Sequence, residues 1–253
     1  MTKKGLTVLG GSNDESQNQD REFLTAEREI STPEFLQAVL ENKREDVAKM
    51  IVQDDRLVRS RDASGATAVQ LAVYHGLDDM LGILLRSEVE LDPFEAAAVG
   101  DAERVKALIE ADPSLLTGHS EDGFPLLGLA AFFGRMDVLE LLLEAGADVH
   151  LAATNGALVA PIHSATAHRD PDASIAMARR LLEAGADLDA EQAGGFRPLH
   201  SAAANGHLEL VQLYLQSGAD AEAESDLGKT ALDLARERGR DDVVAYLESR
   251  ASR

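Results

Sequence analysis

Two kinds of short apolar segment alternate along the chain from about residue 34 onward. The first kind is rich in alanine, as at residues 96–98 and 202–204, and predicts a helix that packs closely against its neighbours, because alanine is small and the best helix former. The second kind carries larger apolar residues at helical spacing, such as Leu208, Val211 and Leu215, and predicts an amphipathic helix. The alternation therefore predicts an all-α protein built from helix pairs.

Two sets of glycines punctuate this pattern at nearly regular distances. One set stands in the turn before each alanine-rich segment: Gly123, Gly156, Gly195 and Gly228. The other set follows each amphipathic segment: Gly146, Gly185 and Gly218. Glycine adopts positive φ without steric cost, so the first set predicts tight turns and the second predicts left-handed helix caps. The unit between Gly156 and Gly195 is longer than its neighbours by six residues.

Self-similarity at a period of about 33 residues is typical of a stacked array, in which each unit buries its apolar face against its neighbours. The fullest copy covers residues 195–211, with the sequence GFRPLHSAAANGHLELV, and the segment Gly-Ala-Asp follows the second helix in three units. This pattern resembles the ankyrin repeat. The resemblance implies an all-α ankyrin-repeat solenoid of about seven helix pairs with short β-turn fingers. We place these pairs at about residues 34–61, 62–91, 92–118, 119–152, 153–191, 192–224 and 225–251.

The N-terminal half carries a second regularity. Gly65 matches Gly123 and Gly76 matches Gly134 at one and the same offset. This offset is about eight residues shorter than two ordinary units of the repeat. The missing part is expected to be the finger near residues 87–93, where no turn glycine occurs. We therefore interpret residues 34–91 and 92–150 as two copies of a pair, and expect the third helix pair to tilt relative to the second.

The histidine of the tetrad Arg-Pro-Leu-His has a structural interpretation. In ankyrin repeats this histidine ties adjacent turns together by a hydrogen bond, so the resemblance assigns that role to His200 and to His163. Gly128 and Gln70 replace the histidine in two other units. The bond is therefore not expected in every repeat.

Composition limits the partners more than the fold. The 253 residues have a formal net charge of −21 and contain no cysteine. A nucleic-acid duplex or a membrane surface would repel such a chain, so we expect neither as a partner and favour a basic or weakly charged protein. Disulfides and thiolate sites are excluded. Residues 1–30 are expected to form a flexible tail, and the protein to be a cytoplasmic monomer.

Motifs for catalysis are weak. Gly228-Lys229-Thr230 ends like a phosphate-binding loop, but Ala223 stands where that loop needs a glycine. The sequence His168-Arg169-Asp170 echoes a kinase catalytic loop without its companion motifs. The seven histidines form no helical pair with a glutamate, so no zinc site is indicated. We expect no catalytic residues, no metal and no cofactor.

Partners of ankyrin repeats usually lie along the concave side, formed by finger tips and the exposed ends of the first helices. Five of the ten aromatic residues fall on the corresponding positions here, and aromatic side chains are typical interface anchors. The apolar pair in the long unit is a second candidate. The expected partner-binding residues are Tyr74, His75, Phe124, Phe132, Phe133, Asn155, Leu158, Val159, His168, Phe196 and Asn205.

Packing roles compete with this interpretation for some of these residues. Phe132 or Phe133 could instead pack between repeats, and the loop of Leu158 and Val159 could fold back on a neighbouring finger. The leading hypothesis is a non-catalytic protein–protein interaction scaffold, in a stand-alone ankyrin protein of bacterial type. An inhibitor or regulatory subunit that occludes the active site of a single partner enzyme is the alternative, and a hydrolase using an acidic cleft is a third.

Overall fold

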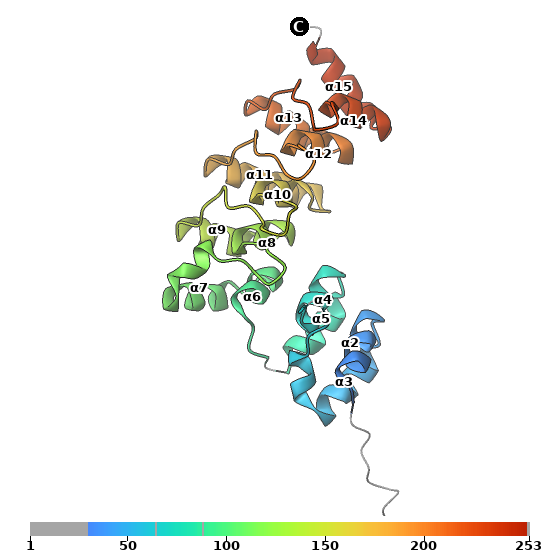
Figure 1. Cartoon of the computed structure of the whole chain (residues 1–253), viewed down its shortest axis with the longest axis vertical. Coiled ribbons are helices and arrows are strands. Elements are labelled where there is room, and N and C mark those ends of the chain that lie inside the picture. Colours follow the sequence, from blue (N-terminus) through green and yellow to red (C-terminus); the bar gives the residue numbers. More distant parts are fainter. Residues whose placement is uncertain (1–29, 64, 88, 252–253) are drawn as a thin grey trace, which may run out of the picture.

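The computed structural model describes residues 30–63, 65–87 and 89–251, so the expected tail lies almost wholly outside the described residues (Figure 1). Within these ranges the regular elements are helices, joined by turns. The all-α solenoid predicted from the sequence is confirmed. Its helices follow each other in pairs: α2 (Thr32–Leu40) and α3 (Arg44–Gln53), α4 (Ala68–Tyr74) and α5 (Asp78–Leu85), α6 (Pro93–Val99) and α7 (Ala102–Ala111), α8 (Leu126–Phe132) and α9 (Met136–Glu144), α10 (Pro161–Thr166) and α11 (Pro171–Glu183), α12 (Pro198–Asn205) and α13 (Leu208–Gln216), α14 (Ala231–Glu237) and α15 (Asp241–Ala251).

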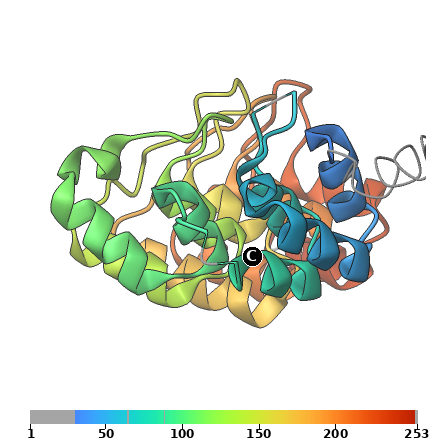
Figure 2. The ribbon, with the colours of Figure 1, turned by 90° about the horizontal axis from the view of Figure 1, so that it is seen from below.

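The first helices of the pairs form a row that runs unbroken through the array. Each packs on the next from α2 to α14, and the molecule is elongated along this row (Figure 1). The second helices form a less regular row: α3 packs on α5, α7 on α9, α11 on α13 and α13 on α15, with little contact between α5 and α7 or between α9 and α11. Both interruptions coincide with a unit of irregular length. The finger loops project on one side of the helices (Figure 2).

Five of the first helices, α4, α6, α10, α12 and α14, begin with the same kind of cap built from different residues, whereas Gly128 leaves α8 without it. The side chain at the third helical position accepts a hydrogen bond from the backbone N–H just before the helix, as in a capping box. Gln70 does this for Thr67, and His200 does it for Arg197 through Nδ1 at 3.0 Å. Pro198 occupies the first helical position, where a missing N–H has no cost.

The core runs along the whole array between the two rows of helices. Leu142, Leu181 and Leu210 of the second helices are completely buried, and so are the small residues Ala165 and Ala202 of the first helices. Each fully buried large apolar side chain contributes about 1.5–3 kcal/mol to the free energy of folding. The small residues allow the first helices to approach one another, as the sequence pattern predicts.

Polar side chains also join neighbouring repeats. His200 Nε2 lies 2.9 Å from the carbonyl oxygen of Ala223 in the following repeat, which agrees with the structural role inferred from the sequence. Arg135 Nε donates to the carbonyl oxygen of Ala98 at 2.8 Å, in the opposite direction along the array. Each of these bonds satisfies a backbone carbonyl that would otherwise end unpaired near a helix terminus or turn.

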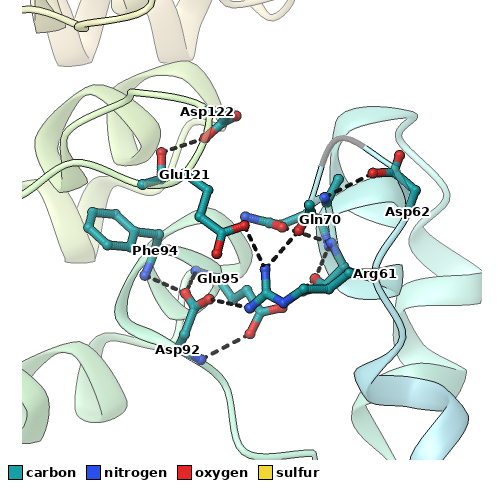
Figure 3. A network of polar contacts seen from close by, with 12 residues as sticks. Arg61, Asp62, Gln70, Asp92, Phe94, Glu95, Glu121 and Asp122 are labelled. Carbon is teal, nitrogen blue, oxygen red and sulfur yellow. Dashed lines mark hydrogen bonds and ion pairs between the residues drawn. The ribbon is translucent and has the colours of Figure 1, made fainter.

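The junction between the second and third helix pairs differs from the others. Among the described residues no finger occurs between α5 and α6, and the first two helix pairs lie to one side of the line followed by the later pairs (Figure 1). Polar contacts add to the continuous apolar core here: the Thr67 hydroxyl donates to the buried carboxylate of Glu95, and Arg61 lies 3.2 Å from Glu121 and 3.9 Å from Asp92 (Figure 3). Burial raises the pKa of Glu95 above its usual value. The array is thus continuous but changes direction here.

Candidate partner-binding groove

A groove of about 390 Å³ crosses the first helices from α8 to α14. Both the fingers and the first helices contribute residues to its lining. We call it the apolar groove, because half of its lining residues are phenylalanine, valine, leucine or alanine and the described lining contains no carboxylate. It is lined by Phe124, Phe132, Val159, His163, Ser164, Ala167, Gln192, Phe196, His200, Ser201, Ala204, Asn205, Leu234 and Arg238.

The floor of the apolar groove is set by one repeat position. This position is the fourth residue of the first helix, directly after the residue whose side chain caps it. The repeat therefore places the same position side by side on α10, α12 and α14, where it is occupied by Ser164, Ser201 and Leu234. Ala167 and Ala204 lie nearly one turn further along their helices. The small side chains of these two alanines leave the hollow open.

The walls are formed by aromatic and branched side chains. Phe124, Val159 and Phe196 come from three successive fingers and are half-buried. The Phe196 ring meets the ring of His200 edge to face, with centroids 6.0 Å apart. At the other side stands Phe132, the last residue of α8, which is 42% exposed. Exposed aromatic surface beside a hollow is a common anchor point for partner proteins.

Phe132 also belongs to a second aromatic group. Its ring meets that of Phe133 edge to face at 5.0 Å, and Phe133 meets Tyr74 in the same way at 5.2 Å. Such pairs are attractive because the positive edge of one ring faces the negative face of the other. The Tyr74 hydroxyl donates to Asp122, and burial together with this carboxylate raises the pKa of Tyr74. The group therefore extends the apolar groove toward the junction.

The two histidines in the lining are neutral at physiological pH. Burial lowers the pKa of His163 to about 4, and burial is also the main cause of the lowered pKa of His200. The backbone groups of Phe196 and Ala190 raise the pKa of His163, but by less than burial lowers it. The Nε2 atom of His163 makes no hydrogen bond with any described residue, unlike Nε2 of His200. Histidine therefore adds no positive charge to the apolar groove.

The structure divides the residues that the sequence indicates for partner binding. Five of them line the apolar groove: Phe124, Phe132, Val159, Phe196 and Asn205. Tyr74 and Phe133 reach it through Phe132. Phe133 is half-buried against the core, so part of its ring packs between repeats, as the alternative interpretation of the sequence expects. Their role in binding stays a prediction.

The other four residues lie outside the groove lining, and two of them make structural contacts of their own. The Asn155 side-chain amide donates to the carbonyl oxygen of Asp122 at 2.9 Å and so joins two fingers. The His168 ring covers Gly134 and contacts the backbone of Asp170. Leu158 has a positive φ of 54° and is 51% exposed at the tip of the long finger, while His75 is exposed at the end of α4.

Sequence reasoning missed several lining residues that the repeat pattern contains. Ser201 and Leu234 are one repeat period apart, and so are Asn205 and Arg238, so each pair occupies one repeat position. Asn205 is among the residues predicted from the sequence, whereas its counterpart Arg238 is not. Comparing each position across all repeats, and not only the aromatic ones, would have found both Leu234 and Arg238.

Metal ligands and membrane-spanning helices would each leave a recognisable arrangement within residues 30–63, 65–87 and 89–251. Within them, no group of three or more histidine, aspartate or glutamate side chains comes together as a metal-binding set would. Among the same residues, no helix has the length and apolar character needed to cross a bilayer.

Two family models match the chain. The model described as ankyrin repeats in three copies matches residues 162–252, and the model of a single ankyrin repeat matches residues 122–156. The chain is 28% identical to the B-cell lymphoma 3 protein homolog of Mus musculus, over 82% of the chain and 40% of that protein. It is 37% identical to Ankyrin repeat and SOCS box protein 16 of Homo sapiens, over 65% of the chain and 46% of that protein. The chain thus spans less than half the length of either relative.

Proposed function

Because the chain belongs to the ankyrin repeat family, we propose that it is a non-catalytic scaffold that holds a partner protein in the apolar groove. Family membership supports protein–protein interaction as the general function. The location and the absence of catalysis are our proposal. The observation that carries it is the convergence of Phe124, Phe132 and Phe196, from three different elements, on one hollow.

Charge supports a two-part recognition. The net charge of −21 attracts a positively charged partner over long range, whereas the lining of the apolar groove favours apolar side chains at short range. Electrostatic attraction of this kind accelerates encounter more than it strengthens the final complex. A basic or weakly charged partner with an exposed apolar segment fits both parts.

The proposal is tested by affinity purification of the full chain, followed by quantitative mass spectrometry. The groove variant combines Phe132→Ser with Phe196→Ser. The matched control is Leu227→Ser, which removes an apolar side chain that is 77% exposed on a finger outside the lining. We expect one or more proteins to be retained by the wild type and the control but lost by the groove variant. Retention of all partners by the groove variant would contradict the proposal.

The same experiment separates the scaffold from the alternative of a dedicated inhibitor. A single enzyme recovered in stoichiometric amount, and inhibited by the wild type but not by the groove variant, would favour the inhibitor. Several partners lost together would favour the scaffold.

A further inference from the structure

The lining of the apolar groove has a charge opposite to that of the chain. The sequence contains 45 acidic residues against 24 basic ones, yet the described lining includes no carboxylate and one charged side chain, Arg238. Arg238 follows directly after α14, at the C-terminal end of the groove. An anionic group of an occupant should therefore be favoured beside Arg238 within the groove, whereas the acidic surface around the groove disfavours anions.

Arg238 also differs from the cations around it. Arg236 lies 2.7 Å from Glu248, Lys229 lies 2.6 Å from Glu237, and Arg197 lies 2.9 Å from Asp189. The guanidinium of Arg238 makes no ion pair or hydrogen bond with any described residue. It is thus an available donor with a planar fork that matches a carboxylate.

A second polar group in the lining is also without a partner. Ser164 is 2% exposed, and its Oγ makes no hydrogen bond within the described part of the chain. It lies opposite Gly128, where an added Cβ would stand 3.9 Å from this oxygen. The equivalent hydroxyl of Ser201 accepts a bond from Gln192 at 3.3 Å. The Ser164 oxygen is enclosed between α8 and α10, so an occupant of the groove does not reach it, and the charge of Arg238 is the feature that selects the occupant.

The geometry points to one kind of occupant, and this inference rests on the proposed function. We propose that the apolar groove binds an extended or helical protein segment that carries a large apolar side chain beside a carboxylate. The apolar side chain fills the space between Phe132 and Phe196, and the carboxylate pairs with Arg238. The partner as a whole is basic or weakly charged, with an acidic residue at this position.

The test is a selection of short random peptides displayed on phage, with the full chain as bait. We expect the enriched peptides to share an apolar residue and an aspartate or glutamate at a fixed spacing. A synthetic peptide of the enriched sequence should bind the Arg238→Glu variant at least tenfold more weakly in a fluorescence anisotropy titration. Replacement of its acidic residue by the corresponding amide should have the same effect on the wild type, and a lysine at that position should restore binding to Arg238→Glu.

Two further variants complete the design. Arg86→Glu makes the same charge change at an exposed site outside the groove and should leave the affinity unchanged. Ser164→Ala should also leave the affinity unchanged, because the Ser164 oxygen is enclosed and out of reach of the occupant. A normal thermal unfolding curve for each variant shows that the fold is intact.

The outcomes distinguish this inference from the function it rests on. Peptides that are lost with Phe196→Ser but bind Arg238→Glu equally well would overturn the inference and leave the scaffold in the groove standing. Peptides that bind regardless of both substitutions would contradict both. Enrichment of basic residues in place of the carboxylate, or a selection without any enriched sequence, would overturn the inference.

Discussion

The region from α8 to α15 and the region from α2 to α5 are built from the same helix pair, but they join to their neighbours differently. In the later region, fingers and first helices repeat in register, so equivalent positions such as Ser164, Ser201 and Leu234 line one continuous hollow. At the α5–α6 junction the described residues form no finger, and polar side chains such as Thr67 and Glu95 add to the apolar contact there. Regular spacing creates a shared surface, whereas its interruption creates a joint with additional polar contacts and a change of direction.

The largest effect is expected from a cavity in the regular region. Leu181→Ala should lower the free energy of unfolding by about 2–5 kcal/mol, because Leu181 is completely buried and the array around it cannot collapse fully. Since each repeat contacts only its neighbours, hydrogen exchange should increase mainly in α8 to α13. Urea unfolding and exchange mass spectrometry measure both. An equal increase of hydrogen exchange in α2 to α5 would show that the stability of these helices is coupled to the later repeats across the α5–α6 junction as strongly as across a regular interface.

The joint itself is tested by two threonines that cap equivalent helices. Thr67 and Thr230 both cap a first helix through Oγ1, but only the Thr67 hydroxyl also donates to a buried carboxylate of the next repeat. Thr230→Val should cost about 1 kcal/mol, the value of a helix cap. Thr67→Val should cost about 2–3 kcal/mol, because it also leaves Glu95 without this donor. Equal losses in chemical unfolding would mean that the contact with Glu95 contributes nothing.

Acid should weaken the regular region through His163. Its pKa falls from the ordinary value of 6.5 to about 4 on folding, so between these values the unfolded chain binds more protons than the folded one. The stability that the neutral His163 side chain contributes to the folded state is complete above about pH 6.5 and is lost as the pH falls toward 4. From pH 7 to pH 5 the loss should be about 2 kcal/mol. The control is His163→Gln, whose unfolding free energy should depend less steeply on pH over this range; equal slopes would contradict the assignment.

The smallest effect on stability is expected at the most exposed aromatic residue of the groove. Phe132→Ser should lower the free energy of unfolding by about 0.5–1 kcal/mol, because the ring is 42% exposed but still contacts Phe133 edge to face. Phe133→Ser should cost about 1–2 kcal/mol, since that ring is half-buried against the core and contacts Tyr74. Thermal and urea unfolding of the two variants measure the difference. A larger loss at Phe132 would show that it packs between repeats and does not serve as an anchor.

Most of the fold is readable from the sequence because each local signal recurs. The turn glycines, the proline at the start of α12 and the alanine-rich first helices each carry a physical reason that is repeated in neighbouring units. The absent finger is visible as a shortened offset between Gly65 and Gly123. What the pattern does not contain is the set of replacement contacts, because Arg61 and Glu121 are 60 residues apart and meet only after the array has bent.

The candidate site is predictable in part. The aromatic residues of the groove occupy positions that can be counted from the repeat, and so does Asn205. Arg238 and Ser164 are common residue types at positions that carry no aromatic signal. Their distinguishing feature is the lack of a partner among the described residues, and this depends on side chains of other repeats that the sequence does not place.

The central claim is that a partner protein occupies the apolar groove, and site-specific photo-cross-linking tests it directly. A photoreactive amino acid at Asn205, which lines the groove and is exposed, is compared with the same amino acid at Lys106, exposed on α7 outside it. We predict a cross-linked partner from position 205 and none from position 106. Equal cross-linking from both positions, or cross-linking from position 106 alone, would contradict the claim.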